Sequence, residues 1–281
     1  MEDELSSLLQ ALGLVPRGVP KPLSGGDIAA VYRLETRQGT VIIKHDDAER
    51  LAGEAEGLRA LREAVSGLIV PVVIGQRDTW LVMDALEAAP RTAMGDTSLG
   101  EGLRELHGAI GDDHGWPRDN ACGLTPQANG PLTDGRVFQR ERRLLPLAAA
   151  CRQQGRLDEA LGGRIEAIAW SLEDWLPDAR PCLVHGDLWS GNVLFTPQGP
   201  GIIDPAVYRH YPEVDLAMLT LFGAPGAAFF EAYWNGDAPA DWPRREALFQ
   251  LYPLLNHLLL FGGAYRSGVE RTVARLETYR D

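Results

Sequence analysis

The sequence predicts an α+β protein with two lobes, in which a small β-rich lobe of residues 1–84 precedes a larger, mainly helical lobe of residues 85–281. Two observations lead to this prediction. Up to the apolar strand Trp80–Met83, short β-branched runs alternate with a single helical stretch. Beyond Glu87 the pattern changes to a series of helices, and 281 residues are enough to form two lobes with a cleft between them.

The elements of the first lobe follow from local sequence. Ser24-Gly25-Gly26-Asp27, followed by the apolar run 28–34, predicts a hairpin tip that enters a strand and lets backbone N–H groups approach a phosphate. A surface hairpin without a ligand explains Gly-Gly-Asp equally well. The β-branched run 41–43 predicts a strand that ends at Lys44. Residues 48–64 are rich in Ala, Leu, Glu and Arg and predict a helix.

The second lobe is predicted to be built from helices, with two short buried strands at 182–184 and 193–195. Residues 111–135 are rich in Gly, Pro, Asp and Asn and predict a long loop, which in a compact domain is usually functional or mobile. Helices are predicted at 99–110, 136–154, 157–176, 212–222, 227–234 and 243–261.

The most informative stretch runs from Leu183 to Phe195 and continues shortly afterwards with Gly201-Ile202-Ile203-Asp204. Four residues separate Asp187 from Asn192, and Asp204 closes the next apolar run. Phosphoryl transfer needs such a set, because one carboxylate faces the acceptor hydroxyl while an amide oxygen and a second carboxylate hold Mg²⁺ against the phosphates. By itself the pattern also fits an ordinary turn, so the kinase interpretation depends on further features upstream.

Those upstream features occur in the required order. Lys44 ends an apolar strand and is one of only two lysines, with Lys21, in a chain that holds 27 Lys and Arg residues. A compact ammonium that reaches two phosphates is a task that arginine performs poorly, so we expect Lys44 to bind nucleotide. Its expected partner is Glu54 on the inward side of helix 48–64, whereas the competing Glu56 would point about 200° away, toward solvent.

Composition restricts the class of protein. The chain is 45% hydrophobic and 23% charged, has no stretch long enough to span a membrane, and begins with an acidic segment, which together predict a cytoplasmic enzyme. The formal net charge of −12 argues against nucleic acid or an anionic membrane as partner and mildly favours amine-bearing substrates. Cys122, Cys151 and Cys182 have no metal-like spacing and are expected to be reduced thiols.

The sequence also resembles the fructosamine kinase (ketosamine-3-kinase) family over nearly its whole length. The most specific signals are Trp189 in the Asp187 loop and Asp204-Pro205-Ala206, where protein kinases have Asp-Phe-Gly. Aminoglycoside and choline kinases share the wider fold but usually lack both signals. The resemblance is carried by 115–117, 119–120, 123, 126–129, 142–144, 185–192, 204–208, 213–218, 221–223, 251–252 and 255–258.

The resemblance implies a protein-kinase-like fold and ATP-dependent phosphorylation of the sugar 3-hydroxyl of ketosamines, as free metabolites or as glycated lysine on proteins. It implies that Asp187 is the catalytic base and that Asn192 and Asp204 bind Mg²⁺. Nucleotide-binding residues would be Lys44 with its partner Glu54, the hairpin residues Gly25, Gly26 and Asp27, and the adenine-binding segment Met83, Asp84, Ala85 and Leu86.

The acceptor stays open at this point. Residues 209–212 lack a glycine that the family pattern leads us to expect, and 132–135 replace an aromatic-rich stretch. The alternatives are an aminoglycoside-type or choline-type acceptor, and a nucleotide-binding regulator without turnover. The oligomeric state is not predicted.

Other residues of these motifs are expected to act through structure. His185 would brace the catalytic loop, and Asp215 would accept hydrogen bonds from that loop's backbone. Trp189 would pack under the loop or, less favoured, form a wall of the sugar site. Asn256 and His257 would be buried and bonded to the same loop.

Overall fold

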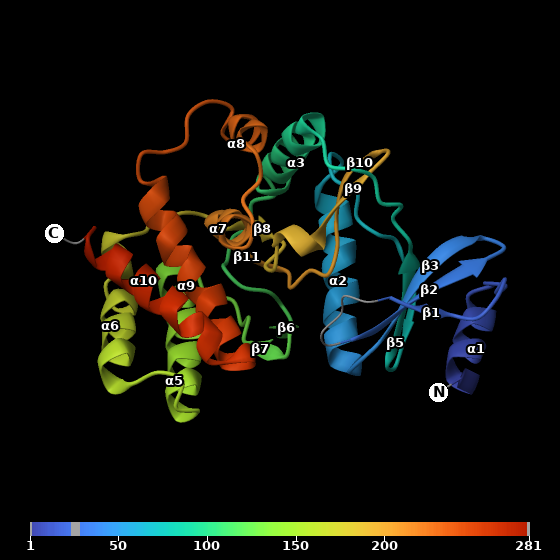
Figure 1. Ribbon diagram of the computed structural model, residues 1–281, viewed down its shortest axis with the longest axis horizontal. Coiled ribbons are helices and arrows are strands. Elements are labelled where there is room, and N and C mark those ends of the chain that lie inside the picture. The colour runs from blue at the N-terminus through green and yellow to red at the C-terminus, as the bar shows by residue number, and fades with distance from the viewer. Residues whose placement is uncertain (1, 24–28, 280–281) are drawn as a thin grey trace.

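The computed structural model describes residues 2–23 and 29–279, and Figure 1 shows its two lobes with helix α2 (Ala48–Ala64) between them. Over these residues the first lobe contains an antiparallel sheet of five strands in the order β1-β2-β3-β5-β4. Helix α1 (Glu2–Ala11) packs on the face of the sheet that α2 does not cover. The strands are β1 (Lys21–Pro22), β2 (Ala30–Thr36), β3 (Gly39–His45), β4 (Val73–Arg77) and β5 (Trp80–Asp84).

The alternation of side chains along β3 explains where Lys44 points. Val41 and Ile43 are buried together with the leucines of α1, whereas Ile42 packs on the opposite face, in the apolar cluster that contains α2. Successive residues of a strand face opposite sides of the sheet, so Lys44 shares the face of Ile42. The strand period therefore directs the ammonium of Lys44 toward α2.

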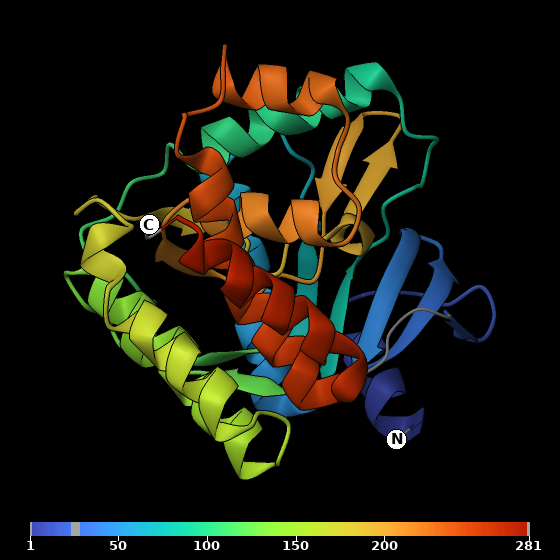
Figure 2. The ribbon, with the colours of Figure 1, turned by 60° about the vertical axis from the view of Figure 1, so that its left-hand side comes forward.

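The second lobe is mainly helical, and its core lies between α5, α6, α7, α9 and α10. Figure 2 shows α5 and α6 side by side, with α9 and α10 packed against them. Three two-stranded antiparallel ladders, β6–β7, β8–β11 and β9–β10, support the connecting segments in the described part of this lobe. The elements are α3 (Ala93–Leu106), β6 (Asn120–Cys122), β7 (Thr125–Gln127), α4 (Gly135–Phe138), the π-helix η1 (Gln139–Leu144), α5 (Leu145–Gln153), α6 (Glu159–Ala169), η2 (Leu172–Asp174), β8 (Cys182–Val184), η3 (Ser190–Asn192), β9 (Val193–Thr196), β10 (Gly199–Ile202), β11 (Tyr208–His210), α7 (Glu213–Leu221), α8 (Ala227–Trp234), α9 (Trp242–Phe261), η4 (Gly263–Tyr265) and α10 (Arg266–Glu277).

Several predicted boundaries differ from the structure. Helix α3 begins at Ala93, six residues before the predicted start at Leu99, because the hydroxyl of Thr92 caps it by accepting a hydrogen bond from the Gly95 N–H at 3.0 Å. The predicted loop 111–135 contains the β6–β7 hairpin. The predicted helix 157–176 is divided into α6 and η2, and helices α1 and α10 were not predicted.

The predicted helix 136–154 is helical throughout but contains a π-helical segment. Pro146 has no N–H to donate to the carbonyl of Arg142, and the Arg143 guanidinium donates to that carbonyl instead, at 3.0 Å. The fully buried Arg143 guanidinium lies 4.7 and 4.2 Å from the ring centres of Phe138 and Tyr208. The widened turn thus places a cation inside the core of the second lobe.

The two lobes share part of their core. Leu58 and Leu61 of α2 belong to the same buried cluster as Leu103 of α3. The backbone of Ile69 accepts from the Ile202 N–H and donates to the Pro200 carbonyl, both at 2.9 Å. Because the two lobes share these contacts, the division of the chain into lobes 1–84 and 85–281, at the end of β5, stays a prediction. Among the helices described in the structure, none is both long and apolar enough to cross a membrane.

Candidate active site

A cavity of about 570 Å³ lies between the lobes and collects the residues that the sequence singled out. The first lobe contributes side chains from β3 and α2, and the second contributes the β6–β7 hairpin, the segment 187–206 and the end of α9. Lys44, Glu54, Asp187, Asn192 and Asp204 all line this cavity, although Lys44 and Asp204 are 160 residues apart in the chain. The fold therefore brings the candidate phosphate-binding, catalytic and metal-binding residues to one site.

Lys44 forms the electrostatic centre of the cavity. Its Nζ lies 2.6 Å from Glu54 Oε1 and 2.6 Å from Asp204 Oδ1, and only 6% of the residue is exposed. Burial by itself lowers the pKa of Lys44, but the negative charges of Glu54 and Asp204 outweigh that effect and raise the pKa above its ordinary value. Lys44 therefore stays a cation, held at the position where a strand lysine contacts phosphates in kinases.

Asp204 adopts an unusual backbone conformation. Its φ is +58°, in the left-handed region that non-glycine residues rarely occupy. Such strain persists where the surroundings impose it, commonly at functional sites. Here the Asp204 carboxylate is bonded through Oδ1 to Lys44, while 44% of the side chain remains exposed. The conformation thus presents a carboxylate to the cavity.

Asp187 and Asn192 lie next to each other across the catalytic loop. Asn192 Nδ2 donates to the Asp187 carbonyl at 2.8 Å and contacts Asp187 Oδ2 at 3.4 Å, which leaves Asn192 Oδ1 for another ligand. Asp187 is partly buried, and desolvation raises its pKa to about 7, although the Cys122 thiol donates a hydrogen bond that acts against the shift. A carboxylate with this pKa can accept a proton near neutral pH.

The backbone that carries Asp187 is held by the buried carboxylate of Asp215. Asp215 Oδ2 accepts from the His185 N–H at 2.7 Å, and Oδ1 accepts from the Gly186 N–H at 2.9 Å. The expected role of Asp215 is confirmed. Behind it, His107 Nε2 lies 3.2 Å from Asp215 Oδ2, and its Nδ1 accepts from the Tyr233 hydroxyl at 2.8 Å. This supporting chain was not predicted, because no local signal connects positions so distant in sequence.

His185 braces the loop, as expected. Its Nε2 donates to the Ile203 carbonyl at 2.9 Å, and its Nδ1 accepts from the Asp187 N–H at 3.3 Å. The ring therefore connects the backbone at Asp187 with the backbone at Ile203, which directly precedes Asp204. The ring is fully buried, and desolvation lowers its pKa, so it stays neutral.

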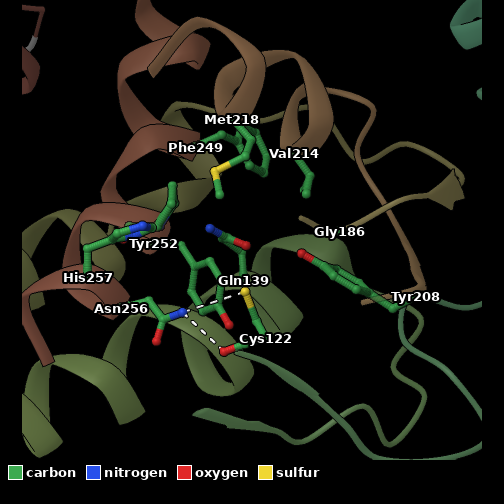
Figure 3. Close-up of a pocket in the computed structure, with 11 residues that line it drawn as sticks. Cys122, Gln139, Gly186, Tyr208, Val214, Met218, Phe249, Tyr252, Asn256 and His257 are labelled. Atoms are coloured by element: carbon green, nitrogen blue, oxygen red, sulfur yellow. Dashed lines mark hydrogen bonds between the residues drawn. The ribbon is translucent and has the colours of Figure 1, made fainter. Parts of the chain in front are cut away.

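Two of the expected structural roles are wrong. Asn256 does not bond to the catalytic loop but to the β6–β7 region, where its Nδ2 lies 3.4 Å from the Cys122 carbonyl and its Oδ1 accepts from Thr125. Figure 3 shows the contact between Asn256 and Cys122, which line a small cavity together with Gly186. His257 is only partly buried, and its Nδ1 donates to the Pro253 carbonyl of its own helix.

Trp189 and Glu56 have contacts beyond those expected. Trp189 lines the cavity and is 40% exposed, and its ring also packs against Gly191 of the loop, so the structure combines the two positions that the sequence left open. Its ring lies so close to Gly191 that a Cβ there would come within 2.2 Å of it. Glu56 does not simply face solvent, because its carboxylate accepts from Trp116 Nε1 at 2.8 Å and from Arg118 Nε at 3.0 Å. It ties α2 to the segment before β6.

The remaining nucleotide-binding candidates are less constrained. Gly25, Gly26 and Asp27 lie outside the described residues. Met83 and Asp84 end the interior strand β5, Ala85 and Leu86 follow it, and none of the four lines the large cavity. The N–H groups of Asp84 and Ala85 donate to the carbonyls of Val72 and Thr40, both at 3.1 Å. Their role toward adenine stays a prediction.

The fold and the site together define a protein-kinase-like phosphotransferase. A family model described as fructosamine kinase matches residues 17–278. The chain is 36% identical to a protein named probable ketoamine kinase from Synechocystis sp., over 89% of this chain and 88% of that protein. The chain belongs to the fructosamine kinase family and is an ATP-dependent phosphotransferase.

Solved structures agree with this assignment. A protein from Thermobifida fusca assigned as a fructosamine-3-kinase superimposes with a TM-score of 0.89 at 30% identity, over 97% of this chain and 98% of that one. The ADP-bound aminoglycoside phosphotransferase APH(2'')-Ib superimposes with a TM-score of 0.63 at 17% identity, over 98% and 96% of the two chains. The second likeness shows the fold alone, which is the predicted two-lobed, protein-kinase-like fold.

Proposed function

We propose that this protein transfers the γ-phosphoryl group of ATP to the 3-hydroxyl of a ketosamine, as a free glycated amine or a glycated lysine. The observation that supports it best is the placement of Asp187, Asn192, Asp204 and Lys44 around one cavity. Its physiological role would be deglycation, because glycated amines are the damaged molecules that such a kinase acts on. The three buried, unpaired cysteines suit the reducing cytoplasm.

Each residue has a defined task in this proposal. Asp187 orients the acceptor hydroxyl and takes its proton as the new oxygen–phosphorus bond forms and the bond to ADP breaks. Lys44 holds phosphate oxygens, and Glu54 fixes the position of its ammonium. The oxygen donors of Asn192 and Asp204 suit Mg²⁺, which prefers few protein ligands and completes its shell with phosphates and water. Bound there, Mg²⁺ would neutralise charge on the phosphates.

The charges around the cavity favour a ketosamine over an aminoglycoside. In the described structure, the carboxylates that line the cavity are Asp46, Glu54, Asp187 and Asp204. Asp46 is bonded to Arg50, while Glu54 and Asp204 are bonded to Lys44. A polycationic aminoglycoside needs a broad acidic surface, whereas three of these four carboxylates are already paired with a cation and Asp187 is assigned to proton transfer. A small acceptor with a single amine does not need one.

The test is transfer from ATP and Mg²⁺ to synthetic fructosamine, ribulosamine and erythrulosamine, with kanamycin and choline as competing acceptors. We expect at least one ketosamine to be phosphorylated, and phosphorus NMR to map the product to the third carbon of the sugar. Asp187→Asn should retain nucleotide binding but lose transfer by roughly 10²–10⁴-fold, because it removes only the base. Efficient phosphorylation of kanamycin with inert ketosamines would contradict the acceptor assignment. A mutant that keeps a third of the activity would contradict the role of Asp187.

A further inference from the structure

One wall of the cavity is aromatic, and the phosphoryl-transfer chemistry gives it no role. Phe222, His257, Phe261 and Tyr265 line the cavity that Asp187 also lines. They come from the end of α7, from α9 and from η4. The His257 ring centre lies 4.8 Å from Phe222, 4.9 Å from Tyr265 and 5.5 Å from Phe261. We call these four side chains the aromatic wall.

The aromatic wall is not simply part of the hydrophobic core. Phe261 is 51% exposed, and Phe222, His257 and Tyr265 are each partly exposed. Exposed aromatic surface inside a cavity costs free energy unless a ligand covers it. The positions of the rings therefore indicate a contact surface for the acceptor.

His257 presents a neutral hydrogen-bond acceptor in this wall. Its Nδ1 lies 2.7 Å from the Pro253 carbonyl, which can only accept, so Nδ1 carries the hydrogen. Nε2 is then an unprotonated acceptor, and it has no partner within residues 2–23 and 29–279. Partial burial lowers the pKa of His257, which keeps the ring uncharged and compatible with a nearby cation.

The chemistry of a ketosamine supplies such a cation. Its amine is protonated at neutral pH and is separated from the reacting hydroxyl only by carbons C1 to C3, so it must bind close to Asp187. The carboxylates of the cavity are paired or needed for transfer, as described above. The faces of aromatic rings attract a cation through their quadrupole and need no carboxylate.

We propose that Phe222, His257, Phe261 and Tyr265 bind the protonated amine of the acceptor, through cation–π contacts and a hydrogen bond to His257 Nε2. The inference rests on the proposed function and adds the property by which the site selects its substrate. The enzyme distinguishes ketosamines from uncharged ketoses by the charge of the amine. These four residues are specificity determinants and take no part in proton transfer.

The test uses two acceptors that differ only in charge: a 1-alkylamino-1-deoxyfructose and the 1-O-alkylfructose ether with the same alkyl group. The wild-type KM for the amine should be lower than that for the ether by roughly tenfold, which lies between the effects of a fully exposed and a fully desolvated cation–π contact. Phe261→Leu and Tyr265→Leu keep apolar bulk but remove the ring, so each should raise the KM for the amine several-fold. The kcat and the KM values for the ether and for ATP should stay unchanged.

Two further variants separate the contributions. His257→Phe keeps a ring but removes Nε2, and we expect it to raise the KM for the amine while leaving the ether unaffected. Trp170→Leu is the matched control, because Trp170 is a 62% exposed aromatic residue that does not line the cavity. It should leave both KM values unchanged. The midpoint of thermal unfolding identifies any variant that fails to fold. In that case Phe261→Leu decides the result, because Phe261 is 51% exposed.

Calorimetric binding of both acceptors to Asp187→Asn gives a second readout that needs no turnover. If amine and ether bind equally, and Phe261→Leu changes neither affinity, the aromatic wall does not recognise the amine, although the proposed function stands. If neither acceptor is phosphorylated, and the ribulosamine and erythrulosamine counterparts are inert as well, the proposed function is wrong. A preference for the amine in the binding experiment would in that case still support the aromatic wall.

Discussion

At the residue scale, Lys44 carries a charge at a position where burial alone would lower its pKa. Two carboxylates at 2.6 Å, those of Glu54 on α2 and of Asp204 after β10, offset the cost of desolvation. The pair with Glu54 joins β3 to α2 within the first lobe, whereas the pair with Asp204 crosses to the second lobe. One ammonium thus links the three parts of the candidate nucleotide site.

We predict that Lys44→Arg impairs the enzyme although it conserves charge. The planar guanidinium cannot take the place of a compact ammonium between Glu54 and Asp204, which are already at hydrogen-bonding distance. The affinity for ATP or the turnover should fall by roughly 10- to 100-fold, the equivalent of one charge-assisted hydrogen bond. Lys21→Arg, on the exposed strand β1, is the control and should behave as wild type. The opposite outcome would mean that the wrong lysine was assigned.

At the scale of elements, the catalytic loop between β8 and β9 has its shape imposed by contacts on both sides. Asp215 at the start of α7 holds the N–H groups of residues 185 and 186, and His185 connects the loop to Ile203. Gly186 has a φ of +82°, and a Cβ there would lie 2.1 Å from the Ala206 carbonyl oxygen. The loop therefore needs glycine at this position for two independent reasons.

We predict that Gly186→Ala lowers both stability and activity. The methyl group strains the backbone and pushes against the carbonyl of Ala206, two residues after Asp204, so we expect a loss of about 1–3 kcal/mol in the free energy of unfolding. Transfer should fall further, because Asp187 follows directly. Gly163→Ala in α6 is the matched control: a Cβ there meets no atom within 4 Å, and we expect a gain of about 0.5–1 kcal/mol. Chemical denaturation and transfer rates measure both effects. If Gly186→Ala and Gly163→Ala had the same effect on stability and transfer, position 186 would have no special need for glycine.

At the scale of the whole molecule, a buried histidine pair joins distant segments of the second lobe. His114 Nε2 donates to the Ala179 carbonyl at 3.1 Å, so its Nδ1 accepts from His210 Nδ1 at 2.8 Å. His210 Nε2 is then an acceptor, and it lies 3.0 Å from Gln139 Oε1. Since the buried Gln139 Nε2 has no partner in the described structure, we assign the amide in the reversed orientation, in which its NH₂ group donates to the ring. Desolvation lowers the pKa of both histidines, and the network is complete when both rings are neutral.

This pair predicts how stability changes with pH. The unfolded chain takes up protons on these histidines near their ordinary pKa of about 6.5, whereas the native state resists protonation. The stabilisation is therefore fully present above that pH and is lost as the pH falls below it, by up to about 1.4 kcal/mol per pH unit for each histidine. His210→Gln should reduce the slope of unfolding free energy between pH 6.5 and pH 5. An unchanged slope would contradict this account.

The sequence by itself determined the class of the fold, the order of most elements and which residues to seek at a candidate site, and the structure places Lys44, Glu54, Asp187, Asn192 and Asp204 around one cavity. Strand and helix periods depend on neighbouring residues, and Asp187, Asn192 and Asp204 lie within one short segment, so local pattern was sufficient. Glu54 was also within reach, because helix geometry places it on the side of α2 that faces Lys44.

Only the tertiary structure decided the contacts between distant parts of the chain. The approach of Asp204 to Lys44, the bond of Asn256 to the β6–β7 hairpin and the exposure of Trp189 depend on how separate elements pack. Helix α9 shows why: its sequence is apolar around most of its circumference, so no period indicated which residues face the cavity. The aromatic wall at its end depends on the packing of α7, α9 and η4, because packing, and not local propensity, places these rings around the cavity that Asp187 also lines.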